Sequence, residues 1–338
     1  MSNLTIPHSL SFAALVQLFF TEYLISQRAM SPCTIASYRD SMLLFLNFAD
    51  SYKGKSPTEL NLGDIKPDLI LAFLDYLEKE RHNAVTSRNL RLAGLRAFLN
   101  FAGRRDVSYL QDVEQALGVP MKKSEAPMLA YLSREEMIAI LGEPGDTWTS
   151  KRDHLLFSIL YNTGARVSET IKITVDDVIL DSSAFVHIHG KGRKERTTPL
   201  WKSTAREICG WLQQNPLLVT GSALLPNRSG QGMTRFNVTQ RLKIAVDRAS
   251  KTYKALSKKR ISPHTIRHTT AMHLLQAGVD FSVIALWLGH ESTTTTHRYV
   301  EANLAMKQLA LDRLQETNVD MSRYSVKDDE LMQFLQAL

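Results

Sequence analysis

The feature that most constrains this chain is the segment from Ser262 to Tyr299, in which His264, Arg267, His290 and Tyr299 follow one another. A planar guanidinium such as that of Arg267 can hold two oxygens of a phosphate through charge-assisted hydrogen bonds while negative charge builds on them. A tyrosine phenol has a pKa of about 10, so Tyr299 would need nearby cations and a proton acceptor to act as a nucleophile. The two histidines are candidates for that acceptor. The order and spacing therefore indicate a site that breaks a phosphodiester.

Two further cations lie upstream of this segment. Arg166 precedes Glu169 by about one helical turn, a spacing at which a carboxylate can orient a guanidinium. Two runs of alternating apolar residues, 184–189 and 197–200, flank a glycine-rich basic sequence and predict a β-hairpin with Lys191 near its tip. An exposed lysine on such a turn can deliver the proton that a leaving 5′ oxygen needs.

These residues and the words around them resemble the tyrosine recombinases, also called the phage integrase family, which includes the Xer recombinases. The resemblance covers nearly the whole chain and rests on four sequence motifs that occur in the family's order. They are YNTGARVSE at 161–169, GKGRKER at 190–196, SPHTIRH at 262–268 and LGH at 288–290. The family's catalytic set, which is arginine, lysine, histidine-x-x-arginine, histidine or tryptophan, and tyrosine, maps in order onto Arg166, Lys191, His264, Arg267, His290 and Tyr299.

The resemblance implies a mechanism. Tyr299 forms a 3′-phosphotyrosyl bond and frees a 5′ hydroxyl, which then attacks the corresponding link in a partner duplex through a Holliday junction. The other implied roles are transition-state stabilisation by Arg166 and Arg267 with Glu169 in support, proton transfer from the tyrosine by His264, protonation of the leaving oxygen by Lys191, and hydrogen bonding to the phosphate by His290. Bond energy is conserved, so no ATP, metal or other cofactor is expected. The expected partner is double-stranded DNA, bound by a homotetramer on two duplexes, with room for an accessory or partner recombinase.

The biological role stays open at this point. Integration, excision or transposition of a mobile element is one prediction, and Xer-type resolution of plasmid or chromosome dimers is an alternative. A type IB topoisomerase or a telomere-resolving enzyme would use the same tyrosine chemistry without exchange between two sites. A DNA-binding regulator that has lost the chemistry is disfavoured by the complete catalytic set.

Two alternative hypotheses, another nucleophile and a metal site, have less support from the sequence. Tyr324 is a conceivable nucleophile, but it lacks the spacing from His290 that Tyr299 has. A metal site on His264, His268 and His273 would need clustered carboxylates or a histidine-glutamate-x-x-histidine word, and the sequence has neither. We therefore predict that His268 and His273 pack between helices.

Composition agrees with a polyanionic partner. The formal net charge is +7, and the two cysteines, Cys33 and Cys209, offer neither a disulfide framework nor a pair of metal ligands. The apolar run from Leu10 to Phe20 contains Gln17 and no lysine or arginine precedes it, so it is not a credible signal peptide. No stretch is apolar enough to span a membrane. We expect a cytoplasmic protein associated with the nucleoid.

The predicted fold is mainly α, with a helical N-terminal core-binding domain and a mixed α/β catalytic domain of the DNA breaking-rejoining type, in which helices surround a small antiparallel sheet. The expected parts are a SAM-like domain at residues 10–117, a linker at 118–127, the catalytic domain at 128–316 and a C-terminal tail at 317–338. By resemblance, the tail docks into a neighbouring protomer, and docking on its own domain is the alternative. A third short strand is expected near residues 171–175.

Helix signals are clearest in the first of these domains. Ser31 and Pro32 predict a helix start, and further helices are expected at Pro67–Lys79 and at residues 86–102. The last of these should bury Leu90, Gly94, Ala97, Phe98 and Phe101 and present its arginines on another arc. The candidate DNA contacts are Arg88, Arg91 and Arg96 on this helix, Lys122 and Lys123 in the linker, and Arg193 and Lys194 in the hairpin loop. For the three arginines, a solvated helix face is the alternative.

Overall fold

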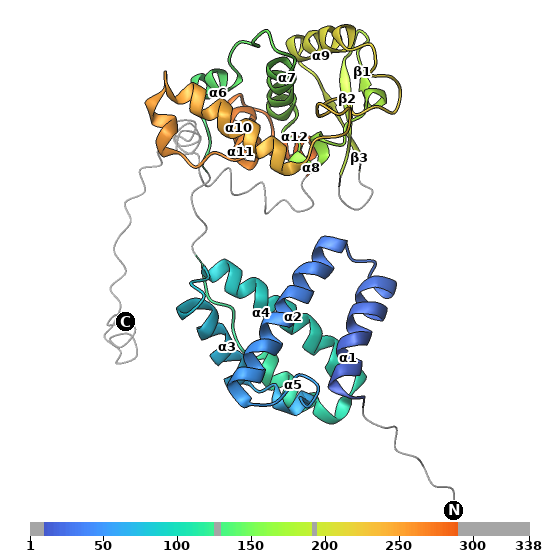
Figure 1. Cartoon of the computed structure of the whole chain (residues 1–338), viewed down its shortest axis with the longest axis vertical. Coiled ribbons are helices and arrows are strands. Elements are labelled where there is room, and N and C mark those ends of the chain that lie inside the picture. The colour runs from blue at the N-terminus through green and yellow to red at the C-terminus, as the bar shows by residue number, and fades with distance from the viewer. Residues whose placement is uncertain (1–9, 125–129, 191–194, 290–338) are drawn as a thin grey trace, which may run out of the picture. The chain divides into compact units, whose positions relative to one another are not determined.

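The computed structural model describes residues 10–124, 130–190 and 195–289, and the chain divides into two compact units between Pro127 and Met128 (Figure 1). We call these the N-terminal unit and the C-terminal unit. The N-terminal unit is helical, and the C-terminal unit combines helices with one three-stranded antiparallel sheet. The predicted fold class is therefore confirmed. No helix in the described ranges is both long enough and apolar enough to cross a membrane.

The helices of the N-terminal unit begin and end at residues whose chemistry explains the boundary. The Ser31 hydroxyl accepts from the Thr34 amide and Pro32 occupies the first turn, as predicted, while Gly54 ends the same helix in the left-handed conformation at φ +66°. The elements are α1 (Phe12–Leu18) with a π-helical continuation (Phe19–Gln27), α2 (Pro32–Lys53), α3 (Pro67–Lys79), α4 (Val85–Arg105), α5 (Leu110–Leu117) and 3-10 helices at Leu62–Asp64 and Val107–Tyr109.

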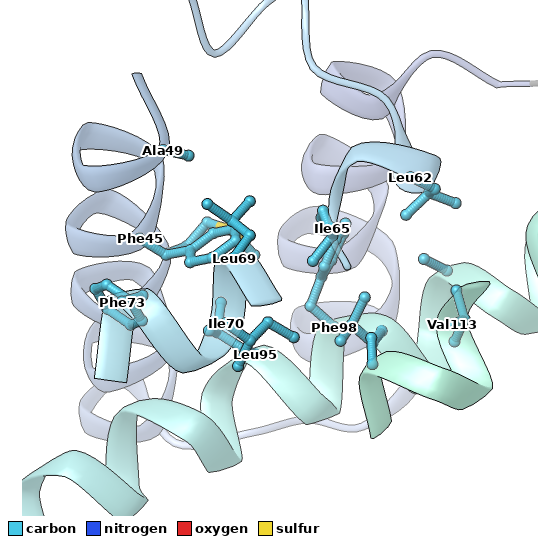
Figure 2. Close-up of a cluster of buried hydrophobic side chains, with 14 of the residues drawn as sticks. Phe45, Ala49, Leu62, Ile65, Leu69, Ile70, Phe73, Leu95, Phe98 and Val113 are labelled. Atoms are coloured by element: carbon cyan, nitrogen blue, oxygen red, sulfur yellow. The ribbon is translucent and has the colours of Figure 1, made fainter. Parts of the chain in front are cut away.

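Aromatic and aliphatic side chains from these helices form a single core (Figure 2). Phe45 of α2 meets Phe73 of α3 edge to face, with ring centroids 5.4 Å apart. Phe98 of α4 and Val113 of α5 are buried in the same cluster. Edge-to-face rings combine large apolar burial with favourable quadrupole contacts, so they fix how the helices pack.

The expected faces of α4 are partly wrong. Arg88 is only 4% exposed, whereas Leu90 is 51% exposed. Arg88 stands at the start of the buried stripe that continues through Leu92, Leu95 and Leu99, and Leu90, two residues further on, points to the opposite side. The buried guanidinium lies 3.6 Å from the Glu78 carboxylate and also approaches the Pro120 carbonyl. Arg91 is half-buried and donates weakly to Ser37 and Ser41, and Arg96 is half-buried.

The start of the predicted linker is fastened to the N-terminal unit. Val119 is buried in the core, and the Asn89 side chain forms two hydrogen bonds with the backbone of Lys122, at 2.8 and 3.2 Å. The Lys122 ammonium is paired with Glu78. A side-chain amide that both donates to and accepts from one residue holds extended backbone much as a neighbouring strand would. Residues 119–122 are therefore anchored rather than free.

The first helix of the C-terminal unit begins after Ser133. The Ser133 hydroxyl and the Glu136 carboxylate form a capping box, which satisfies two backbone amides. Its elements are α6 (Arg134–Leu141), α7 (Trp148–Thr163), α8 (Val167–Thr170), β1 (Val178–Ile179), β2 (Phe185–His189), β3 (Glu195–Pro199), α9 (Lys202–Gln214), α10 (Arg235–Ser250), α11 (Pro263–Gln276), α12 (Phe281–Leu288) and 3-10 helices at Val175–Asp177 and Lys254–Lys258.

The sheet contains the predicted hairpin. Strands β2 and β3 pair antiparallel with Val186 opposite Thr198 and Ile188 opposite Arg196, and β1 pairs with β2. The third strand was predicted too early in the chain, because it lies at Val178–Ile179 rather than at residues 171–175. The Asp177 carboxylate accepts from the Thr174 amide and turns the intervening residues into a 3-10 helix.

Candidate active site

The turn between α7 and α8 positions Arg166. Helix α7 ends at Gly164, which adopts φ +59°, and Arg166 is the N-cap residue of α8. A Cβ atom on Gly164 would lie 2.4 Å from Cδ2 of Leu288, the last residue of α12. Glycine is therefore required at this position both for its backbone conformation and for the close approach of α12.

Glu169 is the hub of the ion pairs around Arg166. Its side chain is 4% exposed, and one oxygen accepts from the Arg166 guanidinium at 2.7 Å. The other oxygen accepts from the Arg166 amide at 3.0 Å and from the Arg196 guanidinium at 2.8 Å. Burial by itself would raise the pKa of the Glu169 carboxyl, but the hydrogen bonds and charges of Arg196 and Arg166 outweigh burial and lower that pKa. Glu169 is therefore a carboxylate at neutral pH, and the prediction that it orients Arg166 agrees with this geometry.

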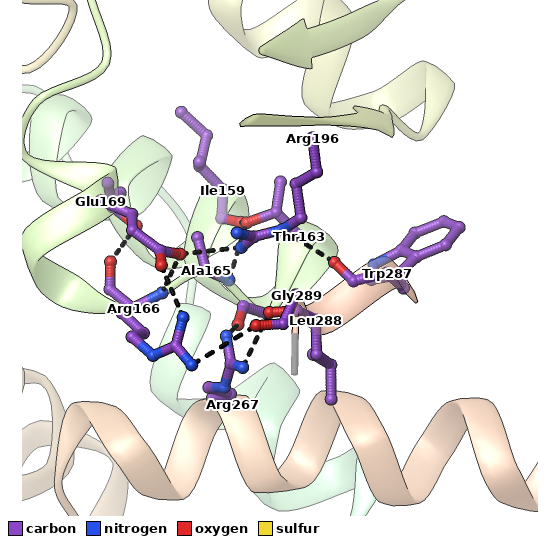
Figure 3. Close-up of polar contacts among 12 residues, drawn as sticks. Ile159, Thr163, Ala165, Arg166, Glu169, Arg196, Arg267, Trp287, Leu288 and Gly289 are labelled. Carbon is purple, nitrogen blue, oxygen red and sulfur yellow. Dashed lines mark hydrogen bonds and ion pairs between the residues drawn. The ribbon is translucent and has the colours of Figure 1, made fainter. Parts of the chain in front are cut away.

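Arg267 is held by backbone carbonyls from two separate segments. Its side chain comes from α11 and is buried, and its two terminal nitrogens donate to the carbonyls of Gly164 at 2.7 Å and Leu288 at 2.8 Å. Arg166 approaches the adjacent Gly289 carbonyl at 3.5 Å. Figure 3 shows both guanidinium groups beside the end of α12. Two arginines that are about 100 residues apart in the sequence are thus brought to one place.

His264 lies in the first turn of α11, after the N-cap Ser262 and Pro263. Desolvation of the ring lowers the pKa of His264, and the nearby cations Arg267 and Arg166 lower it further. The imidazole is therefore uncharged at neutral pH and able to accept a proton. Its ring stacks on that of His268, with centroids 6.3 Å apart.

Five of the predicted site residues lie outside the described residues, namely Lys191, Arg193, Lys194, His290 and Tyr299, as does the alternative nucleophile Tyr324. The structure describes residues that flank four of them, all except Tyr299. The hairpin loop runs between His189 of β2 and Glu195 of β3, and Gly289 directly precedes His290. Gly289 adopts φ +65° at the end of α12 and contributes its carbonyl to the contacts of Arg166.

The sequence argument missed Arg196. Its guanidinium donates to Glu169 at 2.8 Å and to the Trp287 carbonyl at 3.0 Å (Figure 3). The strand alternation offered a signal, because Arg196 falls on the same face as the buried Thr198 two residues later. No sequence pattern identified the partners.

His273, which was considered as a metal ligand, has partners in the structure, and so has His189. His273 contacts the Tyr161 hydroxyl at 2.7 Å and the Leu132 carbonyl at 3.1 Å, so it packs between elements as predicted. His189 bridges Asp177 and Glu195 across the base of the hairpin. Within the three described ranges, no group of three or more histidine, cysteine or acidic residues is arranged to hold a metal ion.

Comparison with known proteins identifies the family. Residues 130–306 match the phage integrase family, and residues 19–106 match the N-terminal SAM-like domain of phage integrases. The chain belongs to the phage integrase family. The predicted resemblance to tyrosine recombinases is therefore confirmed, and the protein is an enzyme of the site-specific DNA recombinase class.

Relatives with different names match this integrase-family chain over most of their length. A putative integrase/recombinase of Sinorhizobium fredii, y4rC, is 40% identical over 97% of this chain and 98% of the relative. The tyrosine recombinase XerD of Shewanella oneidensis is 31% identical over 86% of this chain and 92% of the relative. A solved structure of the Tn1549 transposon integrase with transposon right end DNA aligns with a TM-score of 0.68, covering 90% of this chain and 99% of that one. Its sequence identity is 17%, so this likeness concerns the fold.

Proposed function

We propose that this recombinase cleaves and rejoins double-stranded DNA at specific sites with Tyr299 as the nucleophile. The observation that carries the proposal is the convergence of Arg166 and Arg267 on carbonyls at the end of α12, with an uncharged His264 near enough for both charges to lower its pKa. Two guanidinium groups fixed by protein contacts can stabilise the charge of a pentacovalent phosphorus without reorganising during the reaction.

The proposed cleavage step balances within the site. The Tyr299 oxygen bonds to phosphorus, and its proton passes to His264. The bond from phosphorus to the 5′ oxygen breaks, and Lys191 protonates the departing oxygen. His290 donates a hydrogen bond to the phosphate. Rejoining reverses these transfers with a 5′ hydroxyl from the partner duplex, so the phosphodiester energy is conserved and no cofactor is consumed.

The proposed assembly is a homotetramer on two DNA duplexes, with exchange through a Holliday junction. The proposed DNA contacts are the half-buried Arg91 and Arg96, the linker residues Lys122 and Lys123, and the hairpin residues Arg193 and Lys194. Lys122 would have to exchange Glu78 for a phosphate. Arg88 is left out because it is buried and faces Glu78.

A mobile element is the proposed context, in the cytoplasm where the nucleoid DNA lies. Similarity to a putative integrase/recombinase along nearly the whole chain favours integration, excision or transposition. Similarity to XerD keeps Xer-type dimer resolution as a second candidate. A copy of the gene flanked by mobile-element borders would support the first, and a single copy beside a short inverted-repeat site would support the second.

The nucleophile is tested by covalent trapping. A cognate site is first selected from random DNA by binding to Tyr299→Phe, and a nicked version of that site is then incubated with each variant. The wild type and Tyr324→Phe should form an adduct that resists SDS, and Tyr299→Phe should bind without forming one. An adduct from Tyr299→Phe would move the chemistry to another residue. Excess EDTA should leave adduct formation unchanged, and loss that magnesium or manganese restores would point to a metal-dependent reaction.

A further inference from the structure

Arg196 lies on the inner face of the sheet, where burying a charged side chain costs free energy unless the charge is paired. In the antiparallel register it stands opposite the buried Ile188, and its side chain is only 12% exposed. A guanidinium in such a place is stable only when its donors are satisfied. Both neighbours on the strand, Glu195 and Thr197, are exposed, so the side chain of Arg196 alternates with them toward the inner face.

The donors of Arg196 reach two segments that carry the proposed reaction. One terminal nitrogen donates to Glu169, and the inner nitrogen donates to the carbonyl of Trp287 on α12. The other terminal nitrogen lies against Gly289, where an added Cβ would approach it to 2.9 Å. Arg196 thus ties β3 to the start of α8 and to the end of α12.

Glu169 divides its two oxygens between two arginines. One oxygen binds the side chain of Arg166, and the other binds Arg196 and the amide of Arg166. Without Arg196, the second oxygen would lose a charged donor in a buried site, and the remaining guanidinium would be drawn toward both oxygens. Arg166 would then turn away from the Gly289 carbonyl and from Arg267.

We propose that Arg196 is a positioning residue for DNA cleavage, which orients Arg166 through Glu169 and fixes the end of α12 beside Arg267. This inference rests on the proposed function, because Arg166 and Arg267 are there the groups that hold the phosphate. Arg196 itself touches neither DNA nor the reacting atoms in this proposal. The contact with Gly289 also fixes the residue that leads into His290.

Arg196→Lys tests the proposal, because lysine keeps the charge but cannot span Glu169 and the Trp287 carbonyl with a planar fork. The matched control is Thr198→Val, on the same face of the same strand, whose buried hydroxyl has no hydrogen-bond partner. Unfolding followed by tryptophan fluorescence establishes that each variant is folded at the assay temperature. Single-turnover cleavage of saturating nicked DNA is then measured, together with the affinity for that DNA.

We expect Arg196→Lys to bind DNA as the wild type does and to cleave about 10- to 100-fold more slowly, by analogy with the loss when the hydrogen-bonding partner of a metal ligand is removed. The loss should persist on DNA with a bridging 5′-phosphorothiolate, whose leaving group needs no proton. The double variant with Glu169→Gln should be no slower than Glu169→Gln alone, since both substitutions break one bridge. Thr198→Val should cleave at the wild-type rate.

Three results would overturn the inference. Wild-type cleavage by Arg196→Lys would show that the bridge is not needed, and an equal loss in Thr198→Val would show a general packing effect. Rescue by the phosphorothiolate would assign Arg196 to the hairpin of Lys191 instead of to the arginine pair. Failure of the proposed function gives a different result, because the wild type would then form no adduct or Tyr299→Phe would still form one.

Discussion

Replacing Glu169 with glutamine should destabilise the C-terminal unit by about 3–5 kcal/mol at neutral pH, the cost of removing one partner from a buried ion pair. The side chain is 4% exposed and accepts from two guanidinium groups and one backbone amide. A glutamine keeps one acceptor oxygen, but its amide nitrogen would face a guanidinium. Arg166 and Arg196 would then lie close together with no counter-charge between them.

The effect should depend on pH in a direction set by the carboxylate. The folded-state pKa of Glu169 is lowered below its ordinary value, which is about 4.3 in an unfolded chain. The stabilisation is therefore complete above the unfolded pKa and is lost as the pH falls through the folded pKa. The difference between wild type and Glu169→Gln should be constant at neutral pH and shrink in acid.

Tryptophan fluorescence during urea unfolding is a suitable assay, because all four tryptophans, at positions 148, 201, 211 and 287, belong to the C-terminal unit. With a slope of about 2–3 kcal/mol per molar urea, the midpoint should fall by about 1–2.5 M at pH 7.5. The matched control is Glu195→Gln, whose 69% exposed carboxylate pairs only with a half-exposed His189 among the described residues. Its cost should stay below about 1 kcal/mol.

Two outcomes would refute this reasoning. If Glu169→Gln and Glu195→Gln cost the same, burial does not strengthen the Glu169 bridge. If the difference between wild type and Glu169→Gln persists unchanged at a pH where the wild type itself is protonated, the loss comes from altered packing instead of from the lost charge.

Two further predictions concern residues outside the described ranges. Lys191→Ala should cleave ordinary DNA about 10²–10⁴-fold more slowly and recover on DNA with a bridging 5′-phosphorothiolate. Arg166→Ala and Arg267→Ala should recover far less on that DNA. Equal rescue of all three variants, or rescue of Lys194→Ala alone, would contradict the role of Lys191 as general acid. Deleting residues 325–338 removes the apolar segment 329–338, which is too short to hold a helix alone. The deletion should spare binding to one site, weaken synapsis in a gel-shift assay and change cleavage, and unaltered synapsis would argue for docking on its own domain.

Local signals in the sequence predicted the parts of the fold that depend on neighbouring residues. The start of α2 followed from Ser31 and Pro32, and the bounds of α3 agree with the predicted Pro67–Lys79. The alternating runs around Lys191 predicted β2 and β3. In each case the determining residues lie within a few positions of the boundary, so tertiary packing had little to override.

The features that the sequence did not predict involve partners that are distant in the sequence. Arg88 looked like a surface residue because an arginine normally interrupts an apolar stripe, yet Glu78 on another helix makes its burial tolerable. Arg196 could be assigned to the inner face by alternation, but its partners Glu169 and Trp287 lie 27 and 91 residues away. A single sequence contains no information on such pairings until the register of the elements is known.

The carbonyls that hold Arg166 and Arg267, the two arginines proposed to be catalytic, explain why this site and the fold of the C-terminal unit form together. Gly164, Leu288 and Gly289 lie at the ends of α7 and α12, where helix carbonyls lack intrahelical partners and the helix dipole is negative. Arg166 and Arg267 satisfy these carbonyls and are oriented by them in return. Undocking of α12 would remove one contact from each guanidinium group at once and leave Arg166 on Glu169 and Arg267 on the Gly164 carbonyl. The position of α12 therefore affects how the proposed phosphate-binding pair is arranged before DNA arrives.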